Sequence, residues 1–399
     1  MRIALYNSAS RGTGQYVRSL KIANLITSHD PRSTCTILAG NGIVDRVLPY
    51  NTNVVQLPQI WKSTKGILEL RSSAPSQKQA SPDSVVEALA ERRRIIRDVI
   101  DSIMPDVFIV DSRPTGLSDE VVAPLQLAGS FGTRRLLIYR DIVDSPSLTV
   151  QRWREEMTYQ VMEELYDGIG FLGEDYIFDA VDNYGLDTIR HKVRHLGFLG
   201  AINPASSSLD TPTATNKINV LVTVGGGYDG KAIIEAMVDL ITSKCATYDN
   251  FVVTIALGAR SPLVPEDLRC QLDRARADVK VLRHIVDLSA EICLADVVVS
   301  MCGYNSLFEL VEAGKKVIAV PRSHSGCEQI IRAGLIRGIY DGIWIVPQDE
   351  ICASRLAEAL DVALAAPSPK KNVPMNGAAN LERYLLRNDA QRDCAQFPR

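Results

Sequence analysis

Residues 296–329 restrict the possible fold more than any other part of this sequence. The run DVVVS predicts a short buried strand, because it is almost continuously apolar and rich in valine. A glycine-containing turn, an amphipathic helix and a second apolar strand, KVIAV, follow it directly. This order of strand, helix and strand predicts parallel pairing in a sheet whose two faces are covered by helices.

The same alternation of short strands with helices runs through two halves of the chain. In the first half, the segments typical of strands are RIALY, TCTIL, VFIV, RRLLIY, GIGFL and KVRHL. The second half starts at residue 218, with NVLVTV, FVVTIAL, VKVLRHI, DVVVS, KVIAV and IWIV. Residues 201–217, between the halves, are rich in Ser, Thr, Pro and Ala and are typical of a linker. We therefore predict one α/β domain over residues 1–200 and a second over residues 218–375.

Length and composition agree with a two-domain enzyme. The chain has 399 residues, enough for two hydrophobic cores of ordinary size. A formal net charge of −3 gives no basic surface for nucleic acid. No apolar run is long enough for a transmembrane helix, so we expect a cytoplasmic protein with at most peripheral membrane contact. The 8 cysteines form no CxxC pair, which favours reduced thiols over structural zinc.

Two turns in the second half are candidates for binding phosphate. They are Gly225-Gly226-Gly227 and Gly303-Tyr304-Asn305, and each lies between a predicted strand and a predicted helix. Backbone amides and the positive end of the helix dipole favour anions at such positions. The first turn alone is explained equally well by glycines that need a positive φ. Both belong to one predicted sheet, however, where ligands bind at the carboxyl ends of strands.

Further polar residues follow the second turn in an order that suits a nucleotide linked to a sugar. Glu309 lies almost two helical turns after Gly303, where its carboxylate could accept hydrogen bonds from the two hydroxyls of a ribose. The loop after the next strand offers sugar-sized donors and acceptors, namely Arg322, His324, Glu328 and Gln329. The sequence therefore predicts sites for diphosphate, ribose and sugar, in that order.

These motifs resemble the donor-binding signature of nucleotide-sugar glycosyltransferases of the GT-B fold. The likeness is to the lipid-II-forming N-acetylglucosaminyltransferase family of peptidoglycan synthesis and to bacterial relatives with "GGYN" and "PR…EQ" motifs, here CGYN and PRSHSGCEQ. The resemblance implies two Rossmann-like domains facing each other across a cleft, with the donor in the second domain. It also implies that residues 376–399 form a helical segment that returns to the first domain, and that Ile285 and, with less weight, His284 flank the nucleobase.

The first domain carries the residues that the resemblance places near the acceptor. Gly12, Thr13 and Gly14 match the family's GxGHxxR turn, but Gln15 stands where relatives have the histidine that is their usual candidate base. An amide cannot act as a base near neutral pH. We therefore expect a carboxylate at a strand end to take the proton, with Asp111 ahead of Asp141 and with Gln15 orienting the acceptor. Asp144 is a third carboxylate in the same region.

The predicted function is that of an inverting glycosyltransferase of the hexosyltransferase type, without a metal or a cofactor. It would move a sugar from a nucleoside diphosphate, UDP by resemblance, to a small-molecule or lipid acceptor. The sequence has no D-x-D pair of the kind that holds a metal in transferases of another fold. A non-hydrolysing nucleotide-sugar epimerase and a non-catalytic nucleotide-sugar binding protein remain alternatives. A dinucleotide oxidoreductase is disfavoured, because RIALYNSASRGTG does not fit G-x-G-x-x-G.

Overall fold

The computed structural model describes residues 1–8, 12–40, 47–62, 68–70, 82–201, 217–243, 248–283, 287–324, 326–370 and 372–386. Most of the predicted linker, residues 202–216, therefore lies outside the described residues, as do the last residues of the chain, 387–399. Within the described part, none of the helices has the length and apolar character needed to span a membrane.

The N-terminal domain is built on a seven-stranded parallel sheet in the order β3-β2-β1-β6-β7-β8-β9. Its strands are β1 (Arg2–Asn7), β2 (Thr34–Ala39), β3 (Thr52–Gln56), β6 (Val107–Asp111), β7 (Arg134–Arg140), β8 (Gly168–Leu172) and β9 (Val193–His195). A small antiparallel sheet pairs β4 (Ile60–Lys62) with β5 (Leu68–Leu70). The helices are α1 (Gly14–His29), α2 (Pro82–Ile103), α3 (Val122–Ser130), α4 (Pro146–Glu155), α5 (Thr158–Leu165), α6 (Ala180–Tyr184) and the 3₁₀ helix η1 (Asp187–Lys192).

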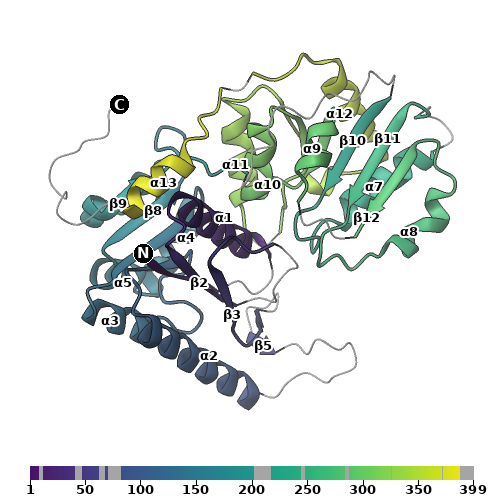
Figure 1. Cartoon of the computed structure of the whole chain (residues 1–399). Coiled ribbons are helices and arrows are strands. Elements are labelled where there is room, and N and C mark those ends of the chain that lie inside the picture. Colours follow the sequence, from purple (N-terminus) through teal and green to yellow (C-terminus); the bar gives the residue numbers. More distant parts are fainter. Residues whose placement is uncertain are drawn as a thin grey trace.

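Helices cover both faces of this sheet because its buried strands are apolar on both sides. In β1, Ile3 and Leu5 belong to the same cluster of buried residues as α1, whereas Ala4 and Tyr6 belong to the cluster that contains α2 and α3. This alternation follows from the two-residue period of a strand. Figure 1 shows the long α2 on the outer side of the domain and α1 on the side that faces the second domain.

The C-terminal domain repeats the plan with a six-stranded parallel sheet in the order β12-β11-β10-β13-β14-β15. Its strands are β10 (Ile218–Thr223), β11 (Phe251–Ala256), β12 (Asp278–Leu282), β13 (Val297–Ser300), β14 (Lys316–Ala319) and β15 (Ile343–Ile345). Its helices are α7 (Lys231–Thr242), α8 (Pro265–Leu272), α9 (Ser289–Leu294), α10 (Tyr304–Glu312), α11 (Glu328–Arg337), η2 (Gln348–Glu350) and α12 (Ala353–Ala365). The predicted α/β architecture with two doubly wound sheets is confirmed.

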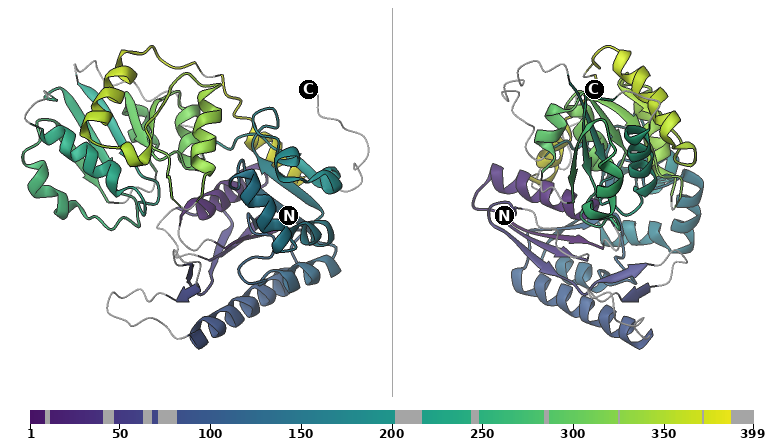
Figure 2. Two further views of the ribbon diagram at one scale, coloured as in Figure 1. Left: turned by 180° about the vertical axis from the view of Figure 1, so that it is seen from behind. Right: turned by 90° about the vertical axis from the view of Figure 1, so that its right-hand side faces the viewer.

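The two domains share one apolar cluster at their interface. The rings of Phe198 and Phe308 stack there with centroids 4.1 Å apart. The last described helix, α13 (Gly377–Leu386), lies against α1 and the N-terminal sheet, so the chain crosses back to the first domain (Figures 1 and 2). Arg134 donates to the backbone carbonyl of Tyr384 at 2.6 Å and stacks over that ring, which fixes α13 in place.

Candidate active site

A cleft of about 1360 Å³ lies between the domains and is bounded by the carboxyl ends of strands from both sheets. On the N-terminal side, the loops after β1, β6 and β7 line it, and on the C-terminal side the loops after β10, β11, β13 and β14 do so. Ligands of open α/β sheets bind at this edge. Among the predicted site residues, those that line the cleft are Gly12, Thr13, Gly14, Gln15, Gly225, Gly226, Gly227, Gly303, Tyr304, Asn305, Glu309, Arg322, Glu328 and Gln329.

The first glycine turn joins β10 to α7 and depends on its lack of side chains. Gly225 and Gly227 have φ values of +59° and +88°, which favour glycine. A Cβ on Gly227 would also lie 2.3 Å from the carbonyl oxygen of Leu257, so no side chain fits there. Gly226 lies opposite the other domain, where a Cβ in its place would be 3.5 Å from the hydroxyl oxygen of Thr13. The turn thus presents bare backbone to the cleft.

The second turn leads into α10, which begins at the cleft and extends along the interface. Gly303 precedes the helix and no side chain caps its first amides, so they remain available to a ligand. Asn305 donates to the backbone carbonyl of Gly14 at 3.0 Å, and its own side-chain oxygen is buried without a partner among the described residues. An anion bound in the cleft would therefore meet the uncapped backbone amides at the start of α10.

Tyr304 has its hydroxyl directed to the domain interface. That hydroxyl accepts a hydrogen bond from the backbone amide of Leu199 at 3.0 Å, and the guanidinium groups of Arg18 and Arg332 lie over the ring, 6.0 and 5.7 Å from its centroid. Burial, reinforced by the charge of Asp141, raises the pKa of Tyr304, so the phenol stays protonated near neutral pH. These contacts suit a residue that holds α10 against the N-terminal domain.

Glu309 lies further along α10 and lines the cleft, with 25% of its side chain exposed. One of its carboxylate oxygens, Oε1, is 2.8 Å from the Nζ of Lys21, a residue of α1 in the other domain. The sequence analysis did not identify Lys21. A charged residue on the apolar face of a predicted helix was the signal that could have found it.

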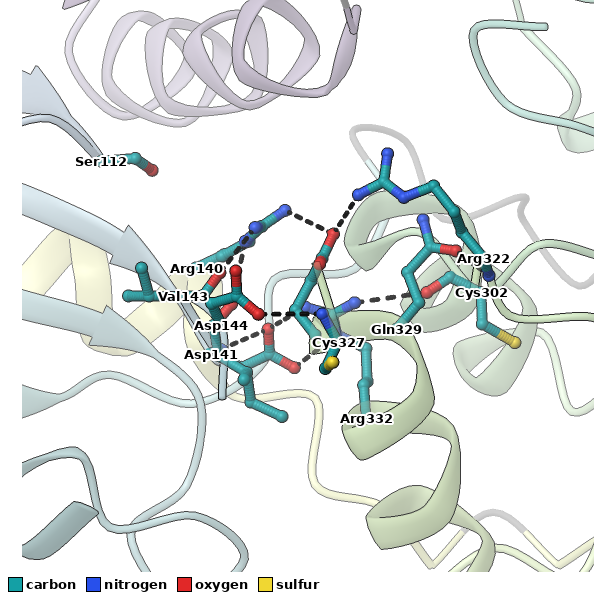
Figure 3. A network of polar contacts seen from close by, with 12 residues as sticks. Ser112, Arg140, Asp141, Val143, Asp144, Cys302, Arg322, Cys327, Gln329 and Arg332 are labelled. Atoms are coloured by element: carbon teal, nitrogen blue, oxygen red, sulfur yellow. Dashed lines mark hydrogen bonds and ion pairs between the residues drawn. The ribbon is translucent and has the colours of Figure 1, made fainter. Parts of the chain in front are cut away.

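The loop after β14 forms a polar network rather than a set of free groups (Figure 3). Arg322 pairs with Glu328 at 2.8 Å and with Asp229 at 3.3 Å, and its backbone amide donates to Gln329 at 2.9 Å. Glu328 is almost fully buried and also lies 3.4 Å from Arg140 of the N-terminal domain. His324 is exposed and does not line the cleft, and His284 and Ile285 lie outside the described residues.

The two carboxylates predicted to act as bases are both held in buried ion pairs. Asp111 receives two hydrogen bonds from Arg18, at 2.8 and 2.5 Å, and lies within 3.4 Å of the Gln15 amide nitrogen. Asp141 receives two from Arg332, at 2.7 and 2.6 Å. Neither lines the cleft. Both carboxylates therefore have their oxygens engaged by a guanidinium and are not presented to an acceptor in the cleft.

Asp144, by contrast, lines the cleft and faces the donor domain. Its Oδ1 accepts from the backbone amide of Cys327, at the start of α11, and from that of Ser145, both at 2.8 Å. Its second oxygen accepts no hydrogen bond from the described residues. Figure 3 shows Asp144 beside Arg140 on the N-terminal side, directed toward the helix that carries Glu328 and Gln329.

Comparison with known proteins gives one match to the sequence of the second domain and several to the fold of the whole chain. Residues 219–384 match the glycosyltransferase family 28 C-terminal domain. A search of curated protein sequences gives no match. The fold is similar to that of a UDP-glucosyltransferase from Polygonum tinctorium capable of glucosylating indoxyl, which is 14% identical and aligns over 97% of this chain and 95% of its own, with a TM-score of 0.59.

Two bacterial structures share the fold at similarly low identity. MurG from Acinetobacter baumannii is 13% identical and aligns over 96% of this chain and 95% of its own, with a TM-score of 0.53. A putative UDP-N-acetylglucosamine 2-epimerase from Listeria monocytogenes is also 13% identical, with 99% and 98% of the two chains aligned and a TM-score of 0.57. At this identity the likenesses establish the fold alone.

Fold and matched domain together define a glycosyltransferase of the GT-B fold. The second domain matches the glycosyltransferase family 28 C-terminal domain, and the resemblance inferred from residues 303–329 is confirmed, because they fall within the matched region.

Proposed function

We propose that this protein transfers a sugar from UDP to a hydroxyl or amine acceptor, with inversion at the anomeric carbon and without a metal ion. The observation that carries the proposal is the convergence of Gly225–Gly227, the start of α10 and Glu309 on one cleft, in the order that a diphosphate and a ribose require. UDP is chosen because the names of two proteins of similar fold refer to UDP-linked sugars.

The proposed reaction is a single displacement. The acceptor oxygen or nitrogen attacks the anomeric carbon, the bond from that carbon to the diphosphate oxygen breaks, and the acceptor's proton passes to a base. Amides of the glycine turn and of α10 would stabilise the negative charge that develops on the diphosphate. We assign the proton to Asp144, because it lines the cleft on the acceptor side and its second carboxylate oxygen accepts no hydrogen bond from the described residues.

A panel of nucleotides tests the donor assignment directly. Thermal unfolding of the pure protein should shift upward with UDP, because a ligand that binds only the folded state stabilises it by mass action. At a UDP concentration about 100 times the dissociation constant, the stabilisation should be about 2.7 kcal/mol. A shift with GDP or dTDP but none with UDP would mean that the donor carries guanine or thymine in place of uracil, and the assignment as a transferase would stand.

Metal independence forms a separate part of the proposal. Backbone amides and helix dipoles, rather than a metal ion, would neutralise the leaving diphosphate. We therefore expect the initial rate of sugar transfer to be unchanged in excess EDTA. A rate that falls in EDTA and returns with Mg²⁺ or Mn²⁺ would show that a cation carries the charge instead.

Epimerisation is the second candidate, because the Listeria protein of similar fold bears that name. The two reactions leave different products. Incubation with UDP-N-acetylglucosamine and no acceptor, followed by proton NMR, should leave the sugar configuration unchanged if the protein is a transferase. Appearance of the 2-epimer would favour the epimerase.

A further inference from the structure

Lys21 is a deeply buried lysine at the interface between the domains, with only 2% of its side chain exposed. It lies on α1, and its Nζ meets two acceptors outside that helix: Oε1 of Glu309 at 2.8 Å and the backbone carbonyl of Gly200. Burying an ammonium group without such partners would cost several kcal/mol. The contacts with Glu309 and Gly200 therefore offset part of the cost of burying this ammonium group.

The helix that carries Glu309 is fixed to the N-terminal domain at further points. Near its start, the hydroxyl of Tyr304 accepts from the backbone amide of Leu199 at 3.0 Å. Near its end, Glu312 accepts from the backbone amide of Ala201 at 2.8 Å. Lys21 binds between these points, so a helix of the C-terminal domain takes its position, and that of Glu309, from residues of the N-terminal domain and of the segment that follows it.

We propose that Lys21 is a positioning residue for the nucleotide, a proposal that rests on the donor site described above. Lys21 occupies one oxygen of the Glu309 carboxylate and leaves Oε2 to accept hydrogen bonds from the ribose hydroxyls. The ion pair also restricts the rotamers of Glu309, so less side-chain entropy is lost when the ribose binds. Recognition of the ribose by the C-terminal domain thus depends on a charge supplied by the N-terminal domain.

Electrostatics favour the same role. A bare carboxylate near a diphosphate would repel it, and the repulsion is strong where water is partly excluded. The ammonium group of Lys21, 2.8 Å from Glu309, offsets that repulsion. If the domains move apart, this distance must grow, because the two residues belong to different domains. Donor affinity and domain contact are therefore coupled through this ion pair.

Calorimetry with UDP and 2′-deoxy-UDP tests the proposal in the full-length protein. The wild type should prefer UDP by about tenfold, the size expected for a charge-assisted hydrogen bond to the 2′-hydroxyl. Lys21→Met should bind 2′-deoxy-UDP more weakly than the wild type, because the Glu309 charge is no longer offset, and should bind UDP more weakly still, by a further factor of about ten, so that the preference disappears. Glu309→Gln should lose the preference too, and the double variant should be no worse than Glu309→Gln, because the residues act together.

Lys315→Met is the matched control. Lys315 also has a partly buried ammonium group, which donates to the backbone carbonyls of Cys293 and Ala295, and it does not line the cleft. Its replacement should leave the preference for UDP unchanged even if it lowers the unfolding temperature.

Three outcomes would overturn the proposal. A Lys21→Met variant that is less stable but keeps the wild-type preference would show that Lys21 only joins the domains. A wild type that binds UDP and its deoxy analogue equally would remove Glu309 from the ribose while leaving the donor assignment in place. A wild type that binds no UDP at all would contradict the proposed donor, and this inference with it.

Discussion

At the scale of single residues, buried cations on interface helices decide which carboxylates remain available for chemistry. Arg18 engages Asp111 within the N-terminal domain, whereas Arg332 reaches Asp141 from a position 191 residues away. The sequence could place both aspartates at strand ends. It could not reveal their partners, because those contacts depend on how helices are rotated and domains are docked. The same limit hid the contact between Lys21 and Glu309.

Replacement of Asp111 should therefore lower the stability of the protein, whereas replacement of Asp144 should lower its activity. Asp111→Asn leaves Arg18 buried without its counter-charge, so we expect a loss of about 3–5 kcal/mol in the free energy of unfolding. The acidic limb of the pH–rate profile should stay where it is. Asp144→Asn should lower kcat by about 10²–10⁴-fold and flatten that limb, since it removes the proposed base. Denaturant unfolding and initial-rate measurements across pH check the pair.

Asparagine is a suitable replacement at Asp144 because its side-chain oxygen can still accept from the amide of Cys327. The interface should therefore survive the substitution. An Asp144→Asn variant with near-normal kcat would exclude Asp144 as the base. A shifted acidic limb in Asp111→Asn would restore Asp111 to that role.

At the scale of elements, the sequence predicted most of the strands because their apolar runs are short and separated by helices. DVVVS and KVIAV correspond to β13 and β14, and the helix between them is α10. The periodic pattern did not show that Tyr304 would turn to the interface, because that depends on where α10 meets the other domain. Nor did it show that His195 would be partly buried, since β9 is a short edge strand.

His195 makes the edge of the N-terminal sheet sensitive to pH. Its Nε2 accepts a hydrogen bond from the backbone amide of Ala180, at the start of α6, at 3.1 Å. Burial lowers the pKa of His195 below its ordinary value of 6.5. The folded state thus resists protonation more than the unfolded state does. The neutral His195 therefore contributes fully to the free energy of unfolding above about pH 6.5, and this contribution is lost as the pH falls toward the lowered pKa.

Thermal unfolding at a series of pH values between about 8 and 5 checks this prediction. The wild type should lose more stability on acidification than His195→Gln, whose amide oxygen can accept the same hydrogen bond without titrating. His29→Gln is the control, because His29 is about half exposed and pairs with Glu382 at the surface. Parallel curves for the wild type and His195→Gln would show that His195 does not contribute to the pH dependence.

At the scale of the whole molecule, the cleft owes its shape to the contacts that hold the two sheets together. Apolar residues of both domains join one cluster, and Asp141 with Arg332 forms an almost fully buried ion pair across the boundary. Glu328 and Arg140 add a further cross-domain contact. The repeated alternation predicted two domains, and the resemblance to GT-B glycosyltransferases implied the cleft between them. The closeness of the domains could not be predicted, because it depends on surfaces that no local pattern describes.

The last prediction concerns the ion pair between Asp141 and Arg332. Arg332→Met leaves a carboxylate buried without its counter-charge, which should cost about 3–5 kcal/mol, and the cost falls on the contact between domains rather than on either core. Calorimetric unfolding should therefore change from one transition toward two.

The double variant Asp141→Asn with Arg332→Met should recover much of the loss, because neither charge then remains. Arg94→Met, which breaks exposed pairs with Glu91 and Asp98, should leave the stability nearly unchanged. If Arg332→Met unfolds in one transition at the wild-type temperature, the ion pair does not hold the domains together, and the apolar cluster around Phe198 and Phe308 must be sufficient.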